Sequence, residues 1–224
     1  MKVVTYATHS YGTFEEIINN PHGVKVDVLG MDSKWLGFMD KIKGVYQYCQ
    51  KLSDDEIVVF IDGFDSTIIK SLDGLEKVFN TLNCGVLLSN NPKILGKYIN
   101  NKIFGTCKNG ITANSGLYMG TVYYLKIFLK ATLEEEYEDD QTNFNSVCSQ
   151  FDWVKVDEDN LIFYNKELND DPNWVPDGVY FKSAPGSPSI QRYVRSIYEY
   201  GYFFKLEILV LILILFLWTL FKSS

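Results

Sequence analysis

A chain of 224 residues that is 46% hydrophobic and 15% aromatic is long enough to bury the core of one domain. Its net charge of −7 and its lack of a basic cluster argue against nucleic acid as a partner, because phosphate backbones are bound by grouped Lys and Arg. The four cysteines include no Cys-x-x-Cys pair, so zinc-ribbon and thioredoxin chemistry are not expected. Cys49 and Cys84 stand in apolar contexts that predict small buried side chains.

Short apolar runs alternate with segments of helical spacing along the chain. These runs predict strands at 2–8, 24–29, 57–61, 85–88, 114–120, 153–156, 161–164 and 179–181. The helical spacing predicts helices at 14–19, 40–52, 72–82, 122–133 and 134–148. The strands at 153–156 and 161–164 are close enough in sequence to form a hairpin. Strands that alternate with helices of this length predict an α/β fold, with a Rossmann-type mixed and mostly parallel sheet flanked by helices.

The run 57–61 is the organising strand, and it ends in the acidic turn Asp62-Gly63-Phe64-Asp65. A short continuous apolar run predicts a buried central strand, and ligands of open α/β sheets bind just outside the carboxyl ends of such strands. Two carboxylates at that position can converge on a hard divalent cation, which prefers oxygen ligands. The alternative is that the pair only caps the following helix, because Asp is a preferred N-cap residue.

Two later segments carry further polar signals. Asn114-Ser115-Gly116 and Gly120 place glycines within an apolar strand, which often marks the close approach of a ligand or of another backbone. Asp139-Asp140-Gln141 belongs to an acidic run that begins at Glu134 and is predicted to open a helix. Because acidic residues at a helix start favour the helix dipole, this run has a plain interpretation as a solvated helix entry beside a functional one.

The C-terminal segment 206–221 is almost continuously apolar, with Glu207 as its one charge. As a helix it would span about 24 Å, short of the roughly 30 Å of a bilayer core, and the aromatic residues 202–204 supply the rest. The sequence therefore predicts a globular domain at 1–181, a linker and juxtamembrane segment at 182–201 and a transmembrane anchor at 202–222. A buried core helix is the alternative. Because no signal peptide precedes the anchor, we expect the globular part on the cytosolic side of the membrane.

These segments together resemble the glycosyltransferase domain of the procollagen lysyl hydroxylases, over about residues 3–181. Residues 4–8 look like the first strand of that family, which lies under the nucleotide, and Leu29-Gly30, Trp35 and Lys41 follow in the family's order and spacing. The segment 60–65 is similar to the family's Asp-x-x-Asp metal motif. Asn114-Ser115-Gly116 looks like its acceptor-side strand, and 139–141 matches an acidic turn near the transferred sugar.

The resemblance implies a GT-A fold and a metal-dependent transfer of sugar from a UDP-sugar to a hydroxyl acceptor, either collagen-like hydroxylysine or another glycan or protein. It implies Mn²⁺ or Mg²⁺ on Asp62 and Asp65. It also implies donor contacts from a larger set of residues, Thr5, Ala7, Thr8, Lys41, Asp62 and Gly63. Asp139, Asp140 and Asn114 would lie at the reacting sugar, where either aspartate would orient the acceptor, act as a base or shield the developing cation.

One feature departs from the family pattern. The family's last strand ends in a histidine that completes the metal site, whereas residues 181–186 contain none. Weak metal binding, a substitute oxygen ligand and an inactive domain are the three consequences to weigh. His9 follows the first strand, where it would either reach the nucleotide or be an exposed turn residue. The family acts in the secretory lumen, so the missing entry signal leaves the collagen-like acceptor open and is compatible with a cytosolic, viral homologue.

Three other functions are weighed against the transferase. Hydroxylation is excluded because the chain has no His-x-Asp iron signature. Phosphohydrolases with an aspartyl nucleophile place a second carboxylate two residues after the first, whereas Asp62 and Asp65 are three apart. A membrane-anchored binding or scaffold protein that keeps the transferase fold without catalysis is the remaining alternative, and the missing histidine favours it.

Overall fold

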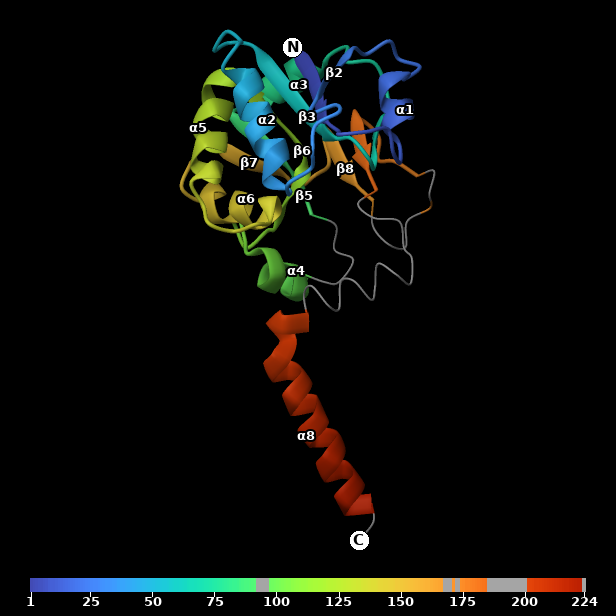
Figure 1. Ribbon diagram of the computed structural model, residues 1–224, viewed down its shortest axis with the longest axis vertical. Coiled ribbons are helices and arrows are strands. Elements are labelled where there is room, and N and C mark those ends of the chain that lie inside the picture. Colours follow the sequence, from blue (N-terminus) through green and yellow to red (C-terminus); the bar gives the residue numbers. More distant parts are fainter. Residues whose placement is uncertain (92–96, 167–170, 172–173, 185–200, 223–224) are drawn as a thin grey trace. The chain divides into compact units, whose positions relative to one another are not determined.

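The computed structural model describes residues 1–91, 97–166, 171, 174–184 and 201–222 (Figure 1). The chain divides into two compact units, Met1–Pro185 and Gly186–Ser224. The first unit is an α/β domain, and the described part of the second is helical. Most of the expected linker, 185–200, lies outside the described residues.

A six-stranded sheet forms the centre of the first unit, in the order β2-β1-β3-β6-β5-β7. The neighbours β1–β2, β1–β3 and β5–β7 are parallel, and β6 runs antiparallel to both strands beside it. This arrangement confirms the predicted mixed, mostly parallel sheet. Its strands are β1 (Lys2–Tyr6), β2 (Val26–Leu29), β3 (Ile57–Asp62), β5 (Val86–Asn90), β6 (Ala113–Thr121) and β7 (Val154–Asp157).

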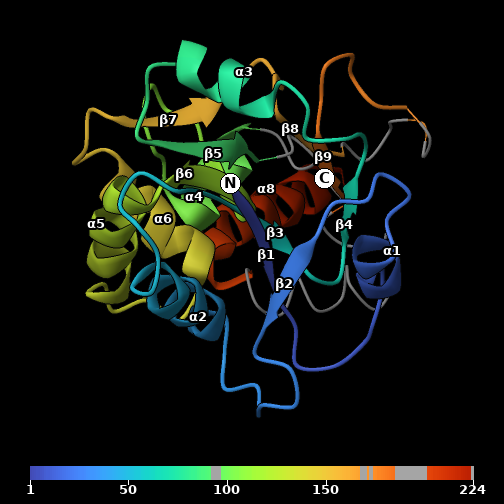
Figure 2. The same cartoon turned by 90° about the horizontal axis from the view of Figure 1, so that it is seen from above.

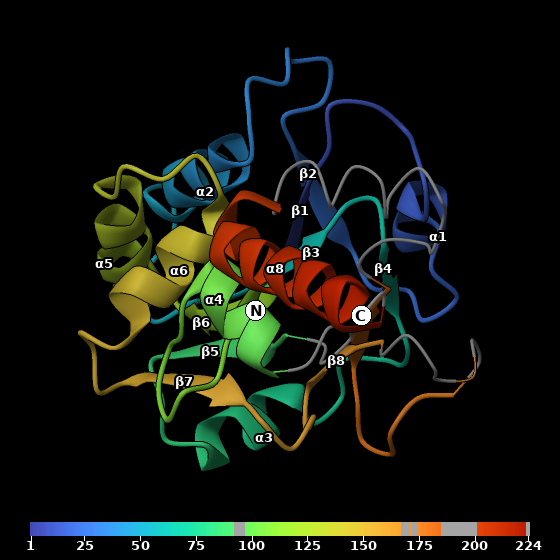
Figure 3. The ribbon, with the colours of Figure 1, turned by 90° about the horizontal axis from the view of Figure 1, so that it is seen from below.

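Both faces of the sheet are buried at its central strand β3, which explains why that strand is a continuous apolar run up to Asp62. Side chains alternate between faces along β3, so Val58 and Phe60 pack on one side while Val59 and Ile61 pack on the other. The first side is covered by the helices α2 (Met39–Cys49), α5 (Val122–Leu133) and α6 (Asp140–Cys148). On the other side lie α1 (Phe14–Ile18) and α3 (Leu75–Thr81), as Figures 2 and 3 show from opposite directions.

A second, three-stranded sheet lies on the face covered by α1. Its order is β4-β9-β8, formed by β4 (Ser66–Ile68), β9 (Phe181–Ser183) and β8 (Phe163–Asn165). Its buried apolar side chains belong to the same core cluster as Val59 and Ile61. The sheet therefore attaches the last part of the domain to the strand that follows the acidic turn.

The expected hairpin of 153–156 with 161–164 is wrong, because β7 belongs to the six-stranded sheet and β8 to the small one. The reason lies at the end of β7, where the Asp157 carboxylate accepts three backbone N–H bonds, each 2.8 Å long, from the residues 161–163. These bonds turn the chain out of the first sheet. Burial raises the pKa of Asp157, and the three donors oppose that shift.

The helix expected from Glu134 begins instead at Asp140, because Asp139 is its N-cap and accepts the backbone N–H of Thr142 at 2.7 Å. Two further elements were not predicted, the short strand β4 and the helix α4 (Lys97–Phe104). The glycine at 120 marks the approach of another backbone, because a Cβ there would lie 2.6 Å from the carbonyl oxygen of Gly85.

A disulfide that was not predicted joins Cys107 to Cys148, with their Cα atoms 5.3 Å apart and a sequence separation of 41. It links the segment after α4 to the last residue of α6. Cys49 is fully buried as expected, and burial raises the pKa of its thiol to about 12. Cys84 is only half-buried, which corrects the expectation that it would be a fully buried side chain.

We expect the double substitution Cys107→Ser and Cys148→Ser to destabilise the domain by up to about 4 kcal/mol, the chain-entropy value for a loop of this length. The thermal midpoint of the full chain in detergent, with and without dithiothreitol, measures the effect. Cys84→Ser is the matched control, because its thiol is free and half-buried. If the double variant and the oxidised wild type melt together, the cross-link contributes nothing to stability.

The second unit contains a short 3₁₀ turn, Gly201–Phe204, followed by α8 (Lys205–Lys222). Among the described residues, one helical segment is long and apolar enough to cross a membrane, and it is Gly201–Trp218. Its apolar side chains from Leu206 to Trp218 are exposed, in contrast to those of the buried core helix considered as the alternative. Length and composition are the two properties that support the predicted anchor.

Candidate active site

The acidic turn lies at the carboxyl ends of β1 and β3, where Tyr6 and Asp62 are register partners. Asp62 ends β3 and its Oδ1 accepts the backbone N–H of Phe64 at 3.2 Å, which holds the turn. Gly63 packs so closely on β1 that a Cβ would lie 2.9 Å from the carbonyl oxygen of Tyr6. A side chain at position 63 would therefore push the turn away from the sheet.

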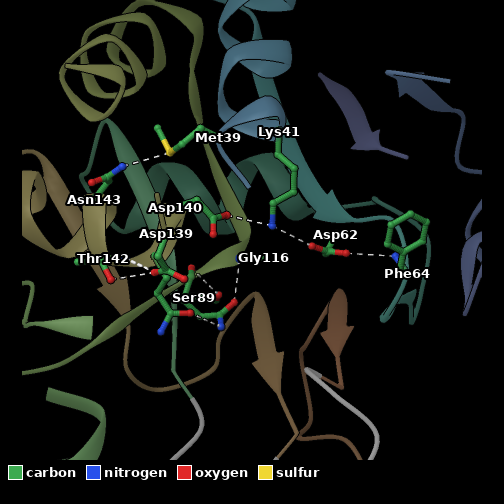
Figure 4. Close-up of polar contacts among 12 residues, drawn as sticks. Met39, Lys41, Asp62, Phe64, Ser89, Gly116, Asp139, Asp140, Thr142 and Asn143 are labelled. Atoms are coloured by element: carbon green, nitrogen blue, oxygen red, sulfur yellow. Dashed lines mark hydrogen bonds and ion pairs between the residues drawn. The ribbon is translucent and has the colours of Figure 1, made fainter. Parts of the chain in front are cut away.

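Lys41 of α2 connects two of the predicted motifs (Figure 4). Its Nζ lies 2.9 Å from Asp140 Oδ2 and 3.2 Å from Asp62 Oδ2, and the residue is only 8% exposed. Burial alone would lower the pKa of Lys41, but the two carboxylates outweigh burial and hold that pKa well above its usual value. The ammonium group therefore stays charged and fixes β3, α2 and α6 around one point.

The two aspartates at the start of α6, Asp139 and Asp140, have different surroundings. Asp140 is buried and paired with Lys41, whereas Asp139 accepts hydrogen bonds from the backbone N–H and the hydroxyl of Thr142, at 2.7 and 2.8 Å. Burial, followed by repulsion from Asp140, raises the pKa of Asp139, although Thr142 and Lys41 oppose the shift. Asp139 is thus the carboxylate whose proton affinity is increased.

The amide of Asn114 joins β6 to α6. Its Nδ2 donates to Gln141 Oε1 at 3.0 Å and to Asn91 Oδ1 at 3.2 Å, while its Oδ1 accepts the backbone N–H of Gly116 at 2.8 Å. A Cβ at Gly116 would lie 3.7 Å from the Cβ of Asp62, so this part of β6 adjoins the acidic turn. Gln141 Nε2 is buried and has no hydrogen-bond partner among the described residues. The structure thus brings the predicted polar motifs together.

Asp65 follows the turn and contacts the end of β9. Its Oδ1 accepts the hydroxyl of Ser183 at 3.0 Å, and its backbone carbonyl accepts the N–H of Ala184 at 2.8 Å. No group of three His, Cys, Asp or Glu side chains suited to a metal is present among the described residues. The two carboxylates Asp62 and Asp65 still fit Mn²⁺ or Mg²⁺ in the chemistry of their donors, because such ions are often held by one or two carboxylates plus substrate phosphates.

The residues expected to contact the donor from β1 differ in exposure. Thr5 and Ala7 are fully buried, and the Thr5 hydroxyl donates to the carbonyl oxygen of Ile61 at 2.8 Å. Thr8 is half-buried, and its hydroxyl lies 3.0 Å from Nδ1 of the exposed His9. Their contacts to a ligand remain a prediction. In this structure, Thr5 and Ala7 shape the site through the packing of β1 against Gly63.

Exposed aromatic rings extend from the site along the loop before α2. The ring centroids of Trp35 and Tyr6 are 6.0 Å apart, those of Trp35 and Phe38 are 5.9 Å apart, and Lys41 Nζ lies 5.6 Å from the centre of Phe38. Trp35 is 40% exposed and Phe38 is 44% exposed. Phe38 and Ser183 were not predicted at the site, and Gln141 was predicted there only as part of the segment 139–141.

The mixed sheet, with an acidic turn at the end of its central strand and a buried lysine beside it, is the arrangement expected of a glycosyltransferase-type domain. The family model for the PLOD GT domain matches residues 1–171. Because this match covers more than half of the chain, the chain belongs to that family, the glycosyltransferase domain of the procollagen lysyl hydroxylases. A sequence comparison with curated proteins finds no match. The family match ends before β9, the strand that carries Ser183.

Proposed function

We propose that the chain transfers a sugar from a UDP-sugar to a hydroxyl acceptor with the help of a divalent cation. The observation that carries the proposal is the convergence of Asp62, Lys41 and Asp140 at the carboxyl end of β3, with Asp65 on the same turn. Carboxylates and a permanently charged ammonium are the groups that a metal-bound diphosphate needs. Family membership supports a glycosyltransferase-type function.

On the donor side, Asp62 and Asp65 would hold Mn²⁺ or Mg²⁺. The ion would supply Lewis-acid stabilisation to the leaving diphosphate. Lys41 is already fixed by two carboxylates, so it would add a positive charge at the diphosphate with little reorganisation. The exposed ring of Trp35 offers a flat surface at the same end of the sheet, where it would contact the nucleoside.

On the acceptor side, Asp139 and Asp140 would have different roles. The raised pKa of Asp139 brings this carboxylate closer to neutral pH, where a general base is most efficient. Asp140 is held by Lys41 and would orient the sugar or shield its developing positive charge. The amides of Asn114 and Gln141 would bind hydroxyl groups, since Gln141 Nε2 has a free donor within the described part of the structure.

The test is hydrolysis of UDP-glucose, UDP-galactose and UDP-N-acetylglucosamine by the full chain in detergent, each with and without Mn²⁺ or Mg²⁺. We expect metal-dependent turnover of one donor, reduced by about 100-fold or more in Asp62→Ala, as for loss of a group that stabilises transition-state charge. Asp73→Ala replaces an exposed aspartate outside the site and should retain the rate. The same rate in Asp62→Ala would contradict the proposed site.

The alternative is a membrane-anchored binding protein that keeps the fold without catalysis. It is favoured by the segment 181–186, which contains no histidine where the family resemblance expects a metal-binding one. Binding of UDP by the folded chain, without turnover of any donor under any metal condition, would establish this alternative in place of the transferase.

We further propose that α8 anchors the protein in a membrane, with length and composition as the supporting evidence. The Cys107–Cys148 disulfide argues against the expected cytosolic side, because disulfides persist mainly in oxidising compartments. Acid quenching of the cells, which preserves the thiol state, followed by alkylation in denaturant and a count of labelled cysteines, decides between the two sides. Two labelled cysteines would indicate an oxidising compartment, and four would indicate the cytosol.

A further inference from the structure

A row of polar side chains runs across the three strands of the small sheet, at the end of the strands nearest Asp65. Ser66, Ser183 and Asn165 are register partners across β4, β9 and β8. The neighbouring row on the same face, two residues away on each strand, is apolar and consists of Ile68, Phe181 and Phe163. All three polar residues are at least 96% buried. Burying such a row is costly unless its polar atoms find partners.

The hydrogen bonds of Asn165 fix the direction of its amide. Nδ2 donates to the carbonyl oxygen of Asn90 at 2.7 Å and to Ser89 Oγ at 3.0 Å. Because a backbone carbonyl only accepts, the amide nitrogen must face β5, and Oδ1 points away from these two partners. Asn165 Oδ1 has no hydrogen-bond partner among the described residues, and neither has the hydroxyl of Ser66. Two unpartnered oxygens therefore flank Ser183.

Ser183 lies between these oxygens and gives its proton to Asp65 Oδ1 at 3.0 Å. A hydroxyl that donates its one proton still has lone pairs to offer. The available polar atoms of the row are therefore all oxygens with lone pairs that could bind a cation, and they lie next to the carboxylate of Asp65. Oxygen donors suit Mg²⁺, Mn²⁺ and Ca²⁺, whereas an imidazole nitrogen also suits Zn²⁺ and Ni²⁺.

We propose that the hydroxyl oxygen of Ser183, supported by Ser66 and Asn165, is a further ligand of the cation site formed by Asp62 and Asp65. This inference rests on the proposed function, and it specifies which ions the site takes. A neutral hydroxyl is a weak ligand, so the ion depends on the diphosphate for much of its binding energy. The site accordingly binds Mg²⁺ and Mn²⁺ together with UDP and discriminates against ions that favour nitrogen.

Calorimetric titration of Mn²⁺, Mg²⁺ and Ni²⁺ into the full chain in detergent, at saturating UDP, tests this proposal. We expect Ser183→Ala to weaken Mn²⁺ binding by about tenfold, the lower end of the effect seen for groups that support metal ligands. Ser183→His should strengthen Ni²⁺ binding relative to Mg²⁺, and the thermal midpoint recorded on the same sample shows whether the variant that binds is folded. Ser71→Ala is the matched control, because that serine also donates to an aspartate, Asp73 at 2.8 Å, away from the site.

The outcomes separate this inference from the proposed function. If Asp62→Ala loses cation binding while Ser183→Ala and Ser183→His bind all three ions as the wild type does, the polar row holds ordered water and the inference is overturned. The proposed function would survive that result. If the wild type binds no cation even with UDP, both proposals fail.

Discussion

Lys41→Met should destabilise the domain by about 3–5 kcal/mol, the cost of removing one partner from a buried ion pair. The reason is that Asp62 and Asp140 would remain at the same point, partly or fully buried, without the cation that now lies between them. Methionine nearly preserves the length and volume of the side chain, so the loss would report charge rather than packing. The urea midpoint of the full chain in detergent measures it.

The stabilisation by the Lys41 ion pairs should depend on pH in a defined direction. Because the pKa of folded Lys41 is held above its unfolded value, the ion pairs stabilise the wild type fully below about pH 10. That contribution is lost only as pH rises through the folded pKa. Lys41→Met should lack this loss of stability at high pH, because methionine carries no charge that could be lost.

Lys43→Met is the matched control, because Lys43 lies on the same helix and is exposed. Its effect should stay within about 0.5 kcal/mol. Equal midpoints for Lys41→Met and Lys43→Met would show that the buried lysine does not hold the two carboxylates together. The transferase proposal would then lose the observation on which it rests.

The central strand and its acidic turn could be predicted from the sequence because their signals are local. A buried strand must be apolar on both faces, and the run 57–61 ends at Asp62. The sheet order then places the ends of β1 and β3 side by side, as an open α/β sheet requires. Lys41 was assigned to the site through the family resemblance. Its two carboxylate partners could not be predicted, because they come from elements far apart in sequence.

The contacts of Asp65 could not be predicted because they depend on the small sheet. Strands were predicted at 161–164 and 179–181, which overlap β8 and β9, but β4 has only three residues and pairs with β9 across more than a hundred residues. Cys107 and Cys148 are similarly distant in sequence and follow no motif. Helix α4 was missed because the sequence at 89–92, Ser-Asn-Asn-Pro, is typical of a turn or loop and gives no helical spacing. Only tertiary packing brings such segments together.

Asp65→Ala offers the cleanest separation of binding from folding. Asp62 is paired with Lys41, so its removal also disturbs the buried charges. Asp65 is half-buried, and its side chain accepts a hydrogen bond from Ser183. Losing the hydrogen bond from Ser183 should cost about 1 kcal/mol. We therefore expect Asp65→Ala to stay folded.

The same variant should lose the Mn²⁺-dependent part of its UDP affinity, because one of two carboxylate ligands is gone. A decrease of about 100-fold, the upper end for loss of metal-site groups, is the expected size. Titration of UDP with and without Mn²⁺ measures it, with the thermal midpoint recorded on the same sample. Asp73→Ala should behave as the wild type in both measurements. Unchanged Mn²⁺-dependent UDP affinity in a folded Asp65→Ala protein would rule out the acidic turn as the metal site, since a cation held elsewhere would not depend on this carboxylate.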